Sequence, residues 1–303
     1  MKIGLTGGAS SAEKLIDQAA RAEEEGFSAM WYPGGGPGDA LLGLVGAATT
    51  DLEIGTSIVQ TYPCHPSLMA QRAAGIAMAM RRPGFVLGIG PSHEPVIEGV
   101  YDMEYSHPGR HTEEYVDILM PLLAGEQVNY TGEDLSYHAM GPAAPPVHPV
   151  PVLIAALGPR LLRVAGEKAD GTVLWMGNAR SIETHVRPCI DAAANSAGKP
   201  TPRVVAGLPV AVHDDVDEAR TVAAEQFAIY GTLPNYQRLL AHGEVDGPGQ
   251  AAIVGDEASV AAQLQGLLDA GASDVWAAPF PVGDDASGSR NRTRALLREL
   301  ANS

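Results

Sequence analysis

The segment from Val152 to Met176 constrains the fold of this chain more than any other. An apolar run of strand length is followed by Gly158-Pro159-Arg160, a short helical stretch and a second apolar run that reaches Trp175. This pattern is typical of one strand-helix-strand unit. Proline favours the first helical position, so we expect a helix to begin there with its unpaired amide groups facing the end of the preceding strand. We therefore predict that a phosphate binds at this helix start.

The rest of the chain repeats this alternation of strands and helices. Further strands are predicted at residues 2–6, 27–31, 52–59, 85–90, 204–212 and 275–279. About eight strands alternating with helices, at this chain length, fit a (β/α)8 TIM barrel. The three tryptophans, Trp31, Trp175 and Trp276, fall at the carboxyl ends of predicted strands. In a barrel of this kind that end is the catalytic face.

A doubly wound open sheet would show the same alternation, but its glycine fingerprint is missing. Gly88-Ile89-Gly90 is followed by His93 where the third glycine of that fingerprint belongs. We therefore favour the barrel. We expect residues 1–303 to form a single (β/α)8 barrel domain.

Two segments are expected to be insertions into this barrel. Residues 127–150 contain a weakly alternating stretch that predicts a small hairpin, followed by a proline-rich connector. Residues 231–250 are too long and irregular for an ordinary connection. A glycine-rich loop at residues 33–38 precedes a helix expected near residues 39–50. We expect the loop and the second insertion to shape the substrate pocket.

Composition and charge exclude several classes of function. The formal charge of -16 at pH 7 argues against binding to nucleic acid or to anionic membranes, which requires a basic surface. Cys64 and Cys189 lie far apart with no CxxC pair, so neither a disulfide scaffold nor a zinc cluster is expected. The chain has no uninterrupted apolar run of the roughly 18 residues that a membrane span requires. We expect a cytoplasmic protein without a metal.

Candidate chemistry follows the strand predicted at 85–90, where Pro91, Ser92, His93 and Glu94 occur in succession. On the barrel interpretation this places a hydroxyl, an imidazole and a carboxylate at the catalytic face. Histidine exchanges a proton near neutral pH, so His93 is the best candidate for an acid or base. The alternative is that His93 and Glu94 only cap the next segment.

Other candidate sites are weaker. His65 precedes Pro66 and is expected to cap a helix. His107 and His111 have helical spacing, but the Pro and Gly between them argue against a metal site on one helix face. Arg290, Arg292 and Arg294 offer a second anion contact at the last helix, although a solvated helix face is the favoured interpretation. The chain has neither a G-x-S-x-G elbow nor a Walker loop.

Five sequence blocks, taken together and in order, resemble the bacterial luciferase-like flavin and deazaflavin oxidoreductases, and most of all the subgroup that uses coenzyme F420. The blocks are Leu52-Glu53-Ile54-Gly55-Thr56-Ser57-Ile58, His65-Pro66, Val86-Leu87-Gly88-Ile89-Gly90-Pro91-Ser92-His93, Ala155-Ala156-Leu157-Gly158-Pro159-Arg160 and Ala169-Asp170-Gly171. The resemblance covers nearly the whole chain. It implies a (β/α)8 barrel, in agreement with the strand count.

The resemblance also implies where the cofactor lies. The phosphate and ribityl side would lie against Gly158, Pro159 and Arg160, and Arg160 would bond to the phosphate or reach the acidic tail. A non-proline cis peptide bond between Ser57 and Ile58 would support one face of the ring. The expected cofactor contacts are Ser57, Ile58, Gly90, Pro91, Ser92, Ala156, Leu157, Gly158, Pro159, Arg160 and Trp175.

The sequence departs from many relatives after the second strand. Trp31-Tyr32-Pro33-Gly34 occupies the place of an Asp-His pair, so a sugar-phosphate dehydrogenase is not expected. The first hypothesis is an F420-dependent oxidoreductase that passes a hydride between the deazaflavin and a small organic substrate, with His93 as the proton partner. Alternatives are an FMN-dependent luciferase-like monooxygenase and a non-catalytic flavin-binding protein. The resemblance implies a homodimer.

Overall fold

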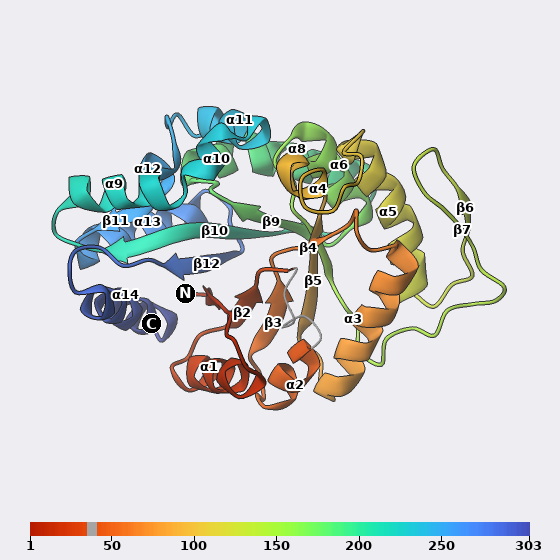
Figure 1. Cartoon of the computed structure of the whole chain (residues 1–303), viewed down its shortest axis with the longest axis horizontal. Coiled ribbons are helices and arrows are strands. Elements are labelled where there is room, and N and C mark those ends of the chain that lie inside the picture. The colour runs from red at the N-terminus through yellow and green to blue at the C-terminus, as the bar shows by residue number, and fades with distance from the viewer. Residues whose placement is uncertain (35–40) are drawn as a thin grey trace.

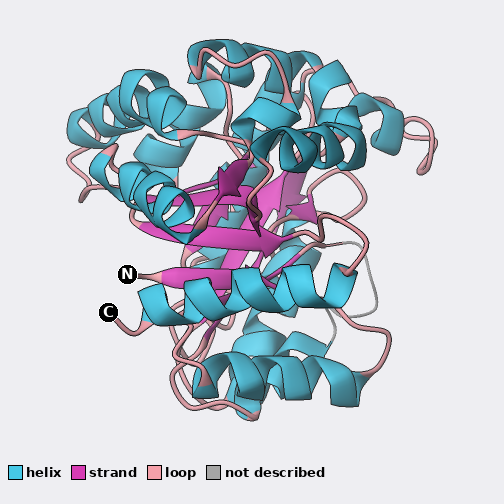
Figure 2. Ribbon diagram, turned by 90° about the vertical axis from the view of Figure 1, so that its left-hand side faces the viewer, coloured by secondary structure: helices cyan, strands magenta, loops and turns pink. Residues whose placement is uncertain are grey.

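The computed structural model describes residues 1–34 and 41–303 of the chain. Within these residues eight parallel strands close into a barrel whose outside is covered by helices (Figure 1 and Figure 2). In order around the barrel these strands are β1 (Ile3–Thr6), β2 (Ala29–Tyr32), β3 (Glu53–Thr56), β5 (Phe85–Gly90), β8 (Val152–Ile154), β9 (Gly171–Trp175), β10 (Arg203–Val212) and β12 (Asp274–Pro279). The barrel is closed because β12 pairs with both β1 and β10. The predicted TIM barrel is confirmed.

Helices follow the strands, and most of them pack against the outside of the barrel. They are α1 (Ala12–Glu24), α2 (Leu42–Ala47), α3 (Pro66–Met80), α4 (Glu94–Ile97), α5 (Pro108–Leu123), α6 (Pro159–Lys168), α7 (Ala179–Ser181), a π-helix (Ile182–Val186), α8 (Arg187–Ser196), α9 (Val216–Gln226), α10 (Ala228–Thr232), α11 (Pro234–His242), α12 (Pro248–Ala251), α13 (Glu257–Asp269) and α14 (Ala286–Ala301). Most of the glycine-rich loop predicted at 33–38, and the start of the helix predicted near 39, lie outside the described residues.

Local sequence signals set where several of these helices begin. The Ser11 hydroxyl accepts a hydrogen bond from the Lys14 amide at 3.3 Å, and Asp256 caps α13 by accepting from the Ser259 amide at 2.8 Å. His65 caps α3 with its Nδ1 atom, which confirms the structural role expected for it. These caps satisfy amide groups that the first helical turn leaves unpaired.

Trp31 fills the inside of the barrel and does not lie on its catalytic rim. Its side chain is fully buried, and its indole ring occupies the space that a Cβ atom would need at Gly4 and at Gly55 on the two neighbouring strands. Gly207 on β10 leaves room for Trp276 in the same way. The prediction that all three tryptophans mark the catalytic face is wrong for Trp31, because an inward-facing strand position also holds a large side chain where its neighbours are glycines.

Arg203 joins opposite sides of the barrel at its amino end. The guanidinium donates to the two carboxylate oxygens of Glu53 at 2.7 and 2.9 Å, and to Asp274 at 2.6 Å. Glu53 begins β3, which lies across the barrel from β10 and Arg203. The guanidinium also lies 5.6 Å from the ring centroid of Trp31, which adds a cation–π contact. These side chains form a floor that closes the amino end.

Residues 231–250 are helical over much of their length, so the expectation of an irregular segment is wrong. Pro234 and Pro248, which suggested a loop, occupy the first turns of α11 and α12. Proline is tolerated there because the amide it lacks has no partner within the helix. The strand β11 (Ile253–Gly255) was not predicted because it is only a short extension beside the end of β10.

The other predicted insertion holds the expected hairpin. Strands β6 (Asn129–Thr131) and β7 (Ser136–His138) pair antiparallel, and the hairpin projects beyond the barrel in Figure 1. Glu114 on α5 holds the connecting turn, because its carboxylate accepts the amides of Glu133, Asp134 and Leu135 at 2.8 to 2.9 Å. This anchors the hairpin to the barrel wall.

Candidate active site

A cavity of about 1170 Å³ lies at the carboxyl ends of the barrel strands. Its lining comes from the ends of the strands and from the segments that follow them, including α10 and α11 after β10. In Figure 1, α10 and α11 lie along the top of the view, as does α4, which follows β5. Active sites of TIM barrels lie at this end, so the cavity is the candidate active site.

The cavity brings together most of the residues expected to bind a cofactor or to react. It is lined by Ser57, Ile58, Pro91, Ser92, His93, Glu94, Leu157, Gly158, Pro159, Arg160 and Trp175. Gly90 and Ala156 are buried behind this wall. A Cβ atom at Gly90 would crowd Ala155 and Ile58, so glycine there permits close packing of the wall itself. Eleven of the thirteen expected residues therefore face one space.

The start of α6 is open toward the cavity. Gly158 is the N-cap residue in an extended conformation, with no side chain to cap the helix, and Pro159 follows it. A Cβ atom added at Gly158 would meet nothing within 4 Å among the described residues. The amides of the first turn have no partner within the helix and carry the positive end of its dipole. This geometry suits the phosphate that the sequence predicts there.

Arg160 is held beside this helix start by an acidic side chain of α5. Its Nη2 atom donates to Glu113 Oε2 at 3.1 Å, and Arg163 donates to the other carboxylate oxygen at 2.8 Å. Burial of Glu113 raises its pKa, but the hydrogen bonds from Arg163 and Arg160 and the charge of Lys168 outweigh burial and hold the pKa at about 2. Glu113 is thus a carboxylate at neutral pH and keeps the guanidinium of Arg160 at the rim.

The strand predicted at 52–59 is interrupted at Ser57 and Ile58. The peptide bond between them is cis, as the resemblance implied, and a short strand β4 (Val59–Gln60) follows beside β5. Ile58 packs toward Gly88 and Gly90. The Ser57 hydroxyl is buried at the cavity without a hydrogen-bond partner in the part of the chain described, so it is placed to bond a ligand.

His93 faces the cavity at the start of α4. It is the N-cap residue, yet its side chain makes no capping hydrogen bond to the described residues, so the alternative role as a helix cap is not what its imidazole does. Its ring centroid lies 5.6 Å from that of Tyr236 on α11. Burial lowers the pKa of His93 below the ordinary histidine value. The imidazole is therefore neutral at pH 7 and can accept a proton.

The two neighbours of His93, Ser92 and Glu94, differ in solvent exposure and in the hydrogen bonds they make. Glu94 begins α4 and is exposed to solvent. Ser92 has a left-handed backbone with φ of 63°, and its carbonyl accepts a hydrogen bond from the Tyr105 hydroxyl at 2.9 Å. Gln60 donates to the Ser92 hydroxyl at 3.4 Å. These bonds fix the loop that carries His93.

Sequence reasoning missed most of an aromatic wall on one side of the cavity. We define this aromatic wall as Trp175, Phe227, Tyr230, Tyr236, Trp276 and Phe280, all of which line the cavity. The ring of Trp175 lies 4.9 Å from that of Trp276 and 6.0 Å from that of Tyr230. A partial signal was present, since Phe227 and Tyr230 are three residues apart, a spacing that favours one helix face.

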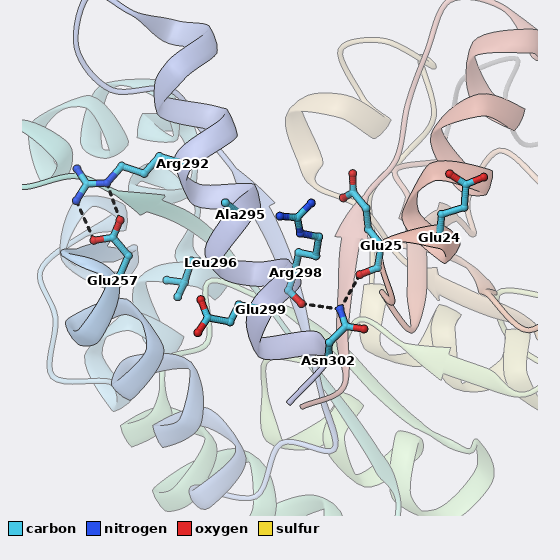
Figure 3. Close-up of a pocket in the computed structure, with 9 residues that line it drawn as sticks. All are labelled: Glu24, Glu25, Glu257, Arg292, Ala295, Leu296, Arg298, Glu299 and Asn302. Atoms are coloured by element: carbon cyan, nitrogen blue, oxygen red, sulfur yellow. Dashed lines mark hydrogen bonds and ion pairs between the residues drawn. The ribbon is translucent and has the colours of Figure 1, made fainter.

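The arginines near the start of α14 do not contact the cavity. Arg292 donates to Glu257 and Asp214, and Arg294 donates to Glu25. A separate hollow beside α14, shown in Figure 3, is lined mainly by charged side chains, of which Arg292 and Glu257 form an ion pair. The second anion contact considered for this helix is therefore not at the active site.

His107 and His111, the pair with helical spacing in the sequence, have structural roles. His111 is buried in α5 and its ring stacks on Tyr62 with centroids 3.9 Å apart. His107 precedes α5 with a left-handed backbone. In the described ranges, 1–34 and 41–303, no three histidine, cysteine or carboxylate side chains are grouped so as to hold a metal. Across the same ranges, each helix is too short or too polar to cross a bilayer.

Comparison with known sequences agrees with this geometry. The sequence model of the family described as luciferase-like monooxygenase matches residues 2–287. A relative from Nakamurella multipartita, named F420-dependent glucose-6-phosphate dehydrogenase, is 31% identical over 233 residues, which are 71% of this chain and 67% of the relative. A relative from Kineococcus radiotolerans with the same name is 25% identical over 284 residues, 85% of this chain and 84% of the relative.

Solved structures show the same fold. An F420-dependent secondary alcohol dehydrogenase in complex with an F420-acetone adduct superposes with a TM-score of 0.78 at 18% identity, over 98% of this chain and 97% of that one. A coenzyme F420-dependent tetrahydromethanopterin reductase from Methanopyrus kandleri superposes with a TM-score of 0.72 at 20% identity, over 98% and 96%. With the family match covering almost its full length, the chain belongs to the luciferase-like monooxygenase family.

Proposed function

We propose that this chain is a coenzyme F420-dependent oxidoreductase that transfers a hydride between the deazaflavin and a small organic substrate. The observation that carries the proposal is the cavity at the carboxyl end of the barrel, which joins an uncapped helix start at Gly158 to an imidazole at His93. Relatives that are named for F420 chemistry match most of the chain and make F420 the first choice.

The residues of the cavity fit a ligand with a phosphate and a flat polar ring. The open start of α6 offers backbone amides to the phosphate, and Arg160 lies beside it. Elsewhere in the cavity lining, the Ser57 hydroxyl after β3 is buried without a hydrogen-bond partner among the described residues. Buried polar groups in native proteins are nearly always paired, so this hydroxyl is suited to the polar edge of a bound ring.

When bound, the deazaflavin would accept or supply the hydride, and the protein would supply position and proton transfer. The imidazole of His93 takes the proton of a substrate hydroxyl while the substrate is oxidised, and returns it to a carbonyl oxygen in the reverse direction. The aromatic wall gives the cavity an apolar side, which disfavours water next to the reacting groups. Ser57 and the start of α6 orient the cofactor.

A fluorescence titration of the purified protein with F420 and, separately, with FMN tests the proposal. We expect tight binding of F420 and weak or no binding of FMN. Tight FMN binding without F420 binding would replace the proposal with an FMN-dependent monooxygenase, in keeping with the family description. F420 binding without turnover of any donor or acceptor would instead support a non-catalytic flavin-binding protein.

We also propose that residues 1–303 act as one barrel domain and as a cytoplasmic homodimer. Support for a dimer comes from α2 and α3, which pack together and expose Leu44, Leu68 and Met78 with 51 to 63% of each side chain accessible. Large apolar side chains grouped on a surface often mark an interface. Light scattering should give twice the mass of the chain, and L68D should reduce that mass to one chain if these helices meet in the dimer.

A further inference from the structure

The aromatic wall and the charges around it restrict what can bind over the cofactor. The wall is formed by residues of β9, the helices after β10, and β12. Tyr230 stands between Trp175 and Tyr236, with ring centroids 6.0 and 4.8 Å away. Trp276 and Phe227 flank Trp175 at 4.9 and 5.9 Å. The rings therefore form one continuous apolar surface, which favours a hydrocarbon portion of a ligand.

Few positive charges reach this space. Among the described residues that line the cavity, the basic side chains are Arg160 and Arg238. Arg160 lies at the start of α6 and is paired with Glu113, while Arg238 is an exposed side chain of α11. Residues 35–40, which are not described, contain neither Lys nor Arg in the sequence. A phosphate group is usually held by several donors, often with a bidentate arginine, and the aromatic wall offers no such set within the described chain.

Two polar groups among those that line this space suit a neutral oxygen. The imidazole of His93 lies against Tyr236, and the Trp175 indole nitrogen is a buried donor without a partner in the described chain. An indole nitrogen donates only, and a neutral imidazole donates from one nitrogen and accepts at the other. Such groups suit a hydroxyl or carbonyl oxygen, whereas a carboxylate or phosphate would be left without a counter-charge in a poorly hydrated space.

We propose that the substrate is a neutral alcohol, or the corresponding carbonyl compound, with a ring or other bulky hydrocarbon part, and that it is not phosphorylated. This inference rests on the proposed F420-dependent function. In oxidation the carbinol C–H bond breaks and its hydride goes to the deazaflavin, while the hydroxyl proton goes to His93 and a C=O double bond forms. Reduction of the carbonyl compound reverses both transfers. The aromatic wall contacts the hydrocarbon part and thereby selects the substrate.

Binding to the cofactor-free G158D variant, whose carboxylate would keep a phosphate from the start of α6, tests this inference independently of turnover. Benzyl alcohol and benzyl phosphate are a matched pair, and calorimetry should give at least tenfold tighter binding for the alcohol. F227A should weaken the binding of benzyl alcohol several-fold, whereas F227L, which keeps an apolar side chain, and R238Q should change it little. Tighter binding of benzyl phosphate, together with its loss in R238Q, would overturn the inference, as would failure of both compounds to bind.

The rate of substrate oxidation by the F420-bound protein is the second test of this inference. With F420 bound, 1-phenylethanol should be oxidised with a kcat/KM at least tenfold above that of glucose 6-phosphate. A preference for glucose 6-phosphate would overturn the inference while leaving the F420-dependent function intact. Failure of F420 to bind in the titration would overturn the proposed function itself, and the calorimetric comparison would still decide the class of ligand.

Discussion

His93 is the residue on which the proposed chemistry depends most directly. Its imidazole faces the cavity, makes no capping bond in the described structure and has its pKa lowered by burial. A base whose pKa lies below the working pH is already deprotonated and ready to accept a proton. Its neighbour Glu94 is exposed, so the two adjacent residues give a matched comparison.

H93A should lower kcat with F420 by about 100-fold or more, since a positioned acid or base contributes roughly that factor. The affinity for F420 should stay within a few-fold, because the phosphate is expected to be held by the start of α6 and not by this imidazole. E94Q serves as the control and should change kcat much less. Steady-state kinetics together with the fluorescence titration measure both quantities; unchanged turnover in H93A would remove this residue from the mechanism.

His111 leads to a prediction about pH and stability. Its pKa is lowered by burial, although the charges of Asp134 and Glu114 act in the opposite direction. The unfolded chain then binds a proton more readily than the folded one, so the free energy of unfolding falls as pH drops below the ordinary value of about 6.5. Its Nε2 atom is also buried without a partner among the described residues.

H111F should keep the ring stacked on Tyr62 and remove the titrating group. The loss of melting temperature between pH 7 and pH 5 should therefore be smaller in H111F than in the unmodified protein. His138 lies exposed on β7, and H138F is the control that should leave the profile unchanged. Scanning calorimetry at a series of pH values measures the effect, and parallel profiles for H111F and the unmodified protein would contradict it.

The elements differ in how far the sequence could predict them. Strand β5 has the bounds predicted for it, 85–90, as an unbroken apolar run. Helix α3 begins at Pro66, directly after the residue that is expected to cap it. The segment 231–250 was misinterpreted because proline and glycine occur both in loops and at helix starts. Only packing against the barrel decides whether such residues form a loop or begin a helix. These long-range contacts are not visible in a local sequence pattern.

The candidate site was predictable where a local motif carries its chemistry. The start of α6 and the loop holding His93 follow strands directly, so their place at the carboxyl end follows once the barrel is inferred. The inside position of Trp31 could not be inferred in this way, because it depends on the glycines of neighbouring strands in the folded register. The aromatic wall likewise depends on how α10 and α11 fold back over the strands.

The helix start at α6 offers a test of the anion site at the level of one element. Gly158 has an extended backbone and open space for a side chain. G158D should cap α6 and preserve folding, but its carboxylate would occupy the amides and repel a phosphate. We expect the Kd for F420 to rise about tenfold or more, since a tenfold change needs only about 1.4 kcal/mol.

G158N and G158A show whether G158D acts through its negative charge or by capping the free amides of α6. Asn caps the helix without a charge, so G158N should weaken F420 binding less than G158D does. Ala leaves the amides accessible and should have the smallest effect. Equal affinities in all three variants and the unmodified protein, measured by fluorescence titration, would mean that the cofactor phosphate binds elsewhere.

At the scale of the whole molecule, the bridge from Arg203 to Glu53 and Asp274 holds the barrel closed at its amino end. Arg292 also pairs with two carboxylates, but on the surface beside α14. The side chain of Arg203 is 25% exposed, and that of Asp274 only 6%. Removing one partner of a buried ion pair leaves the other charge poorly solvated, whereas surface pairs contribute little.

R203M should therefore lower the free energy of unfolding by about 2–4 kcal/mol, since one exposed edge reduces the full cost of breaking a buried pair. R292M should change it by less than about 1 kcal/mol. Urea denaturation measures both values. Neither variant should alter the Kd for F420, because both sites are remote from the cavity. A loss of F420 affinity in folded R203M would contradict the view that the floor and the active site are independent.

The closed floor at the amino end also limits the routes by which substrate and product can enter and leave the protein. It is formed by Arg203, Glu53, Asp274 and Trp31. The packed side chains inside the barrel separate the active-site cavity from this floor, so nothing can leave through the barrel. Substrate must arrive, and product must depart, through the carboxyl-end face on which α4, α10 and α11 lie. A product that leaves the aromatic wall slowly therefore blocks the entry of the next substrate. Product inhibition follows from an active site with a single entrance.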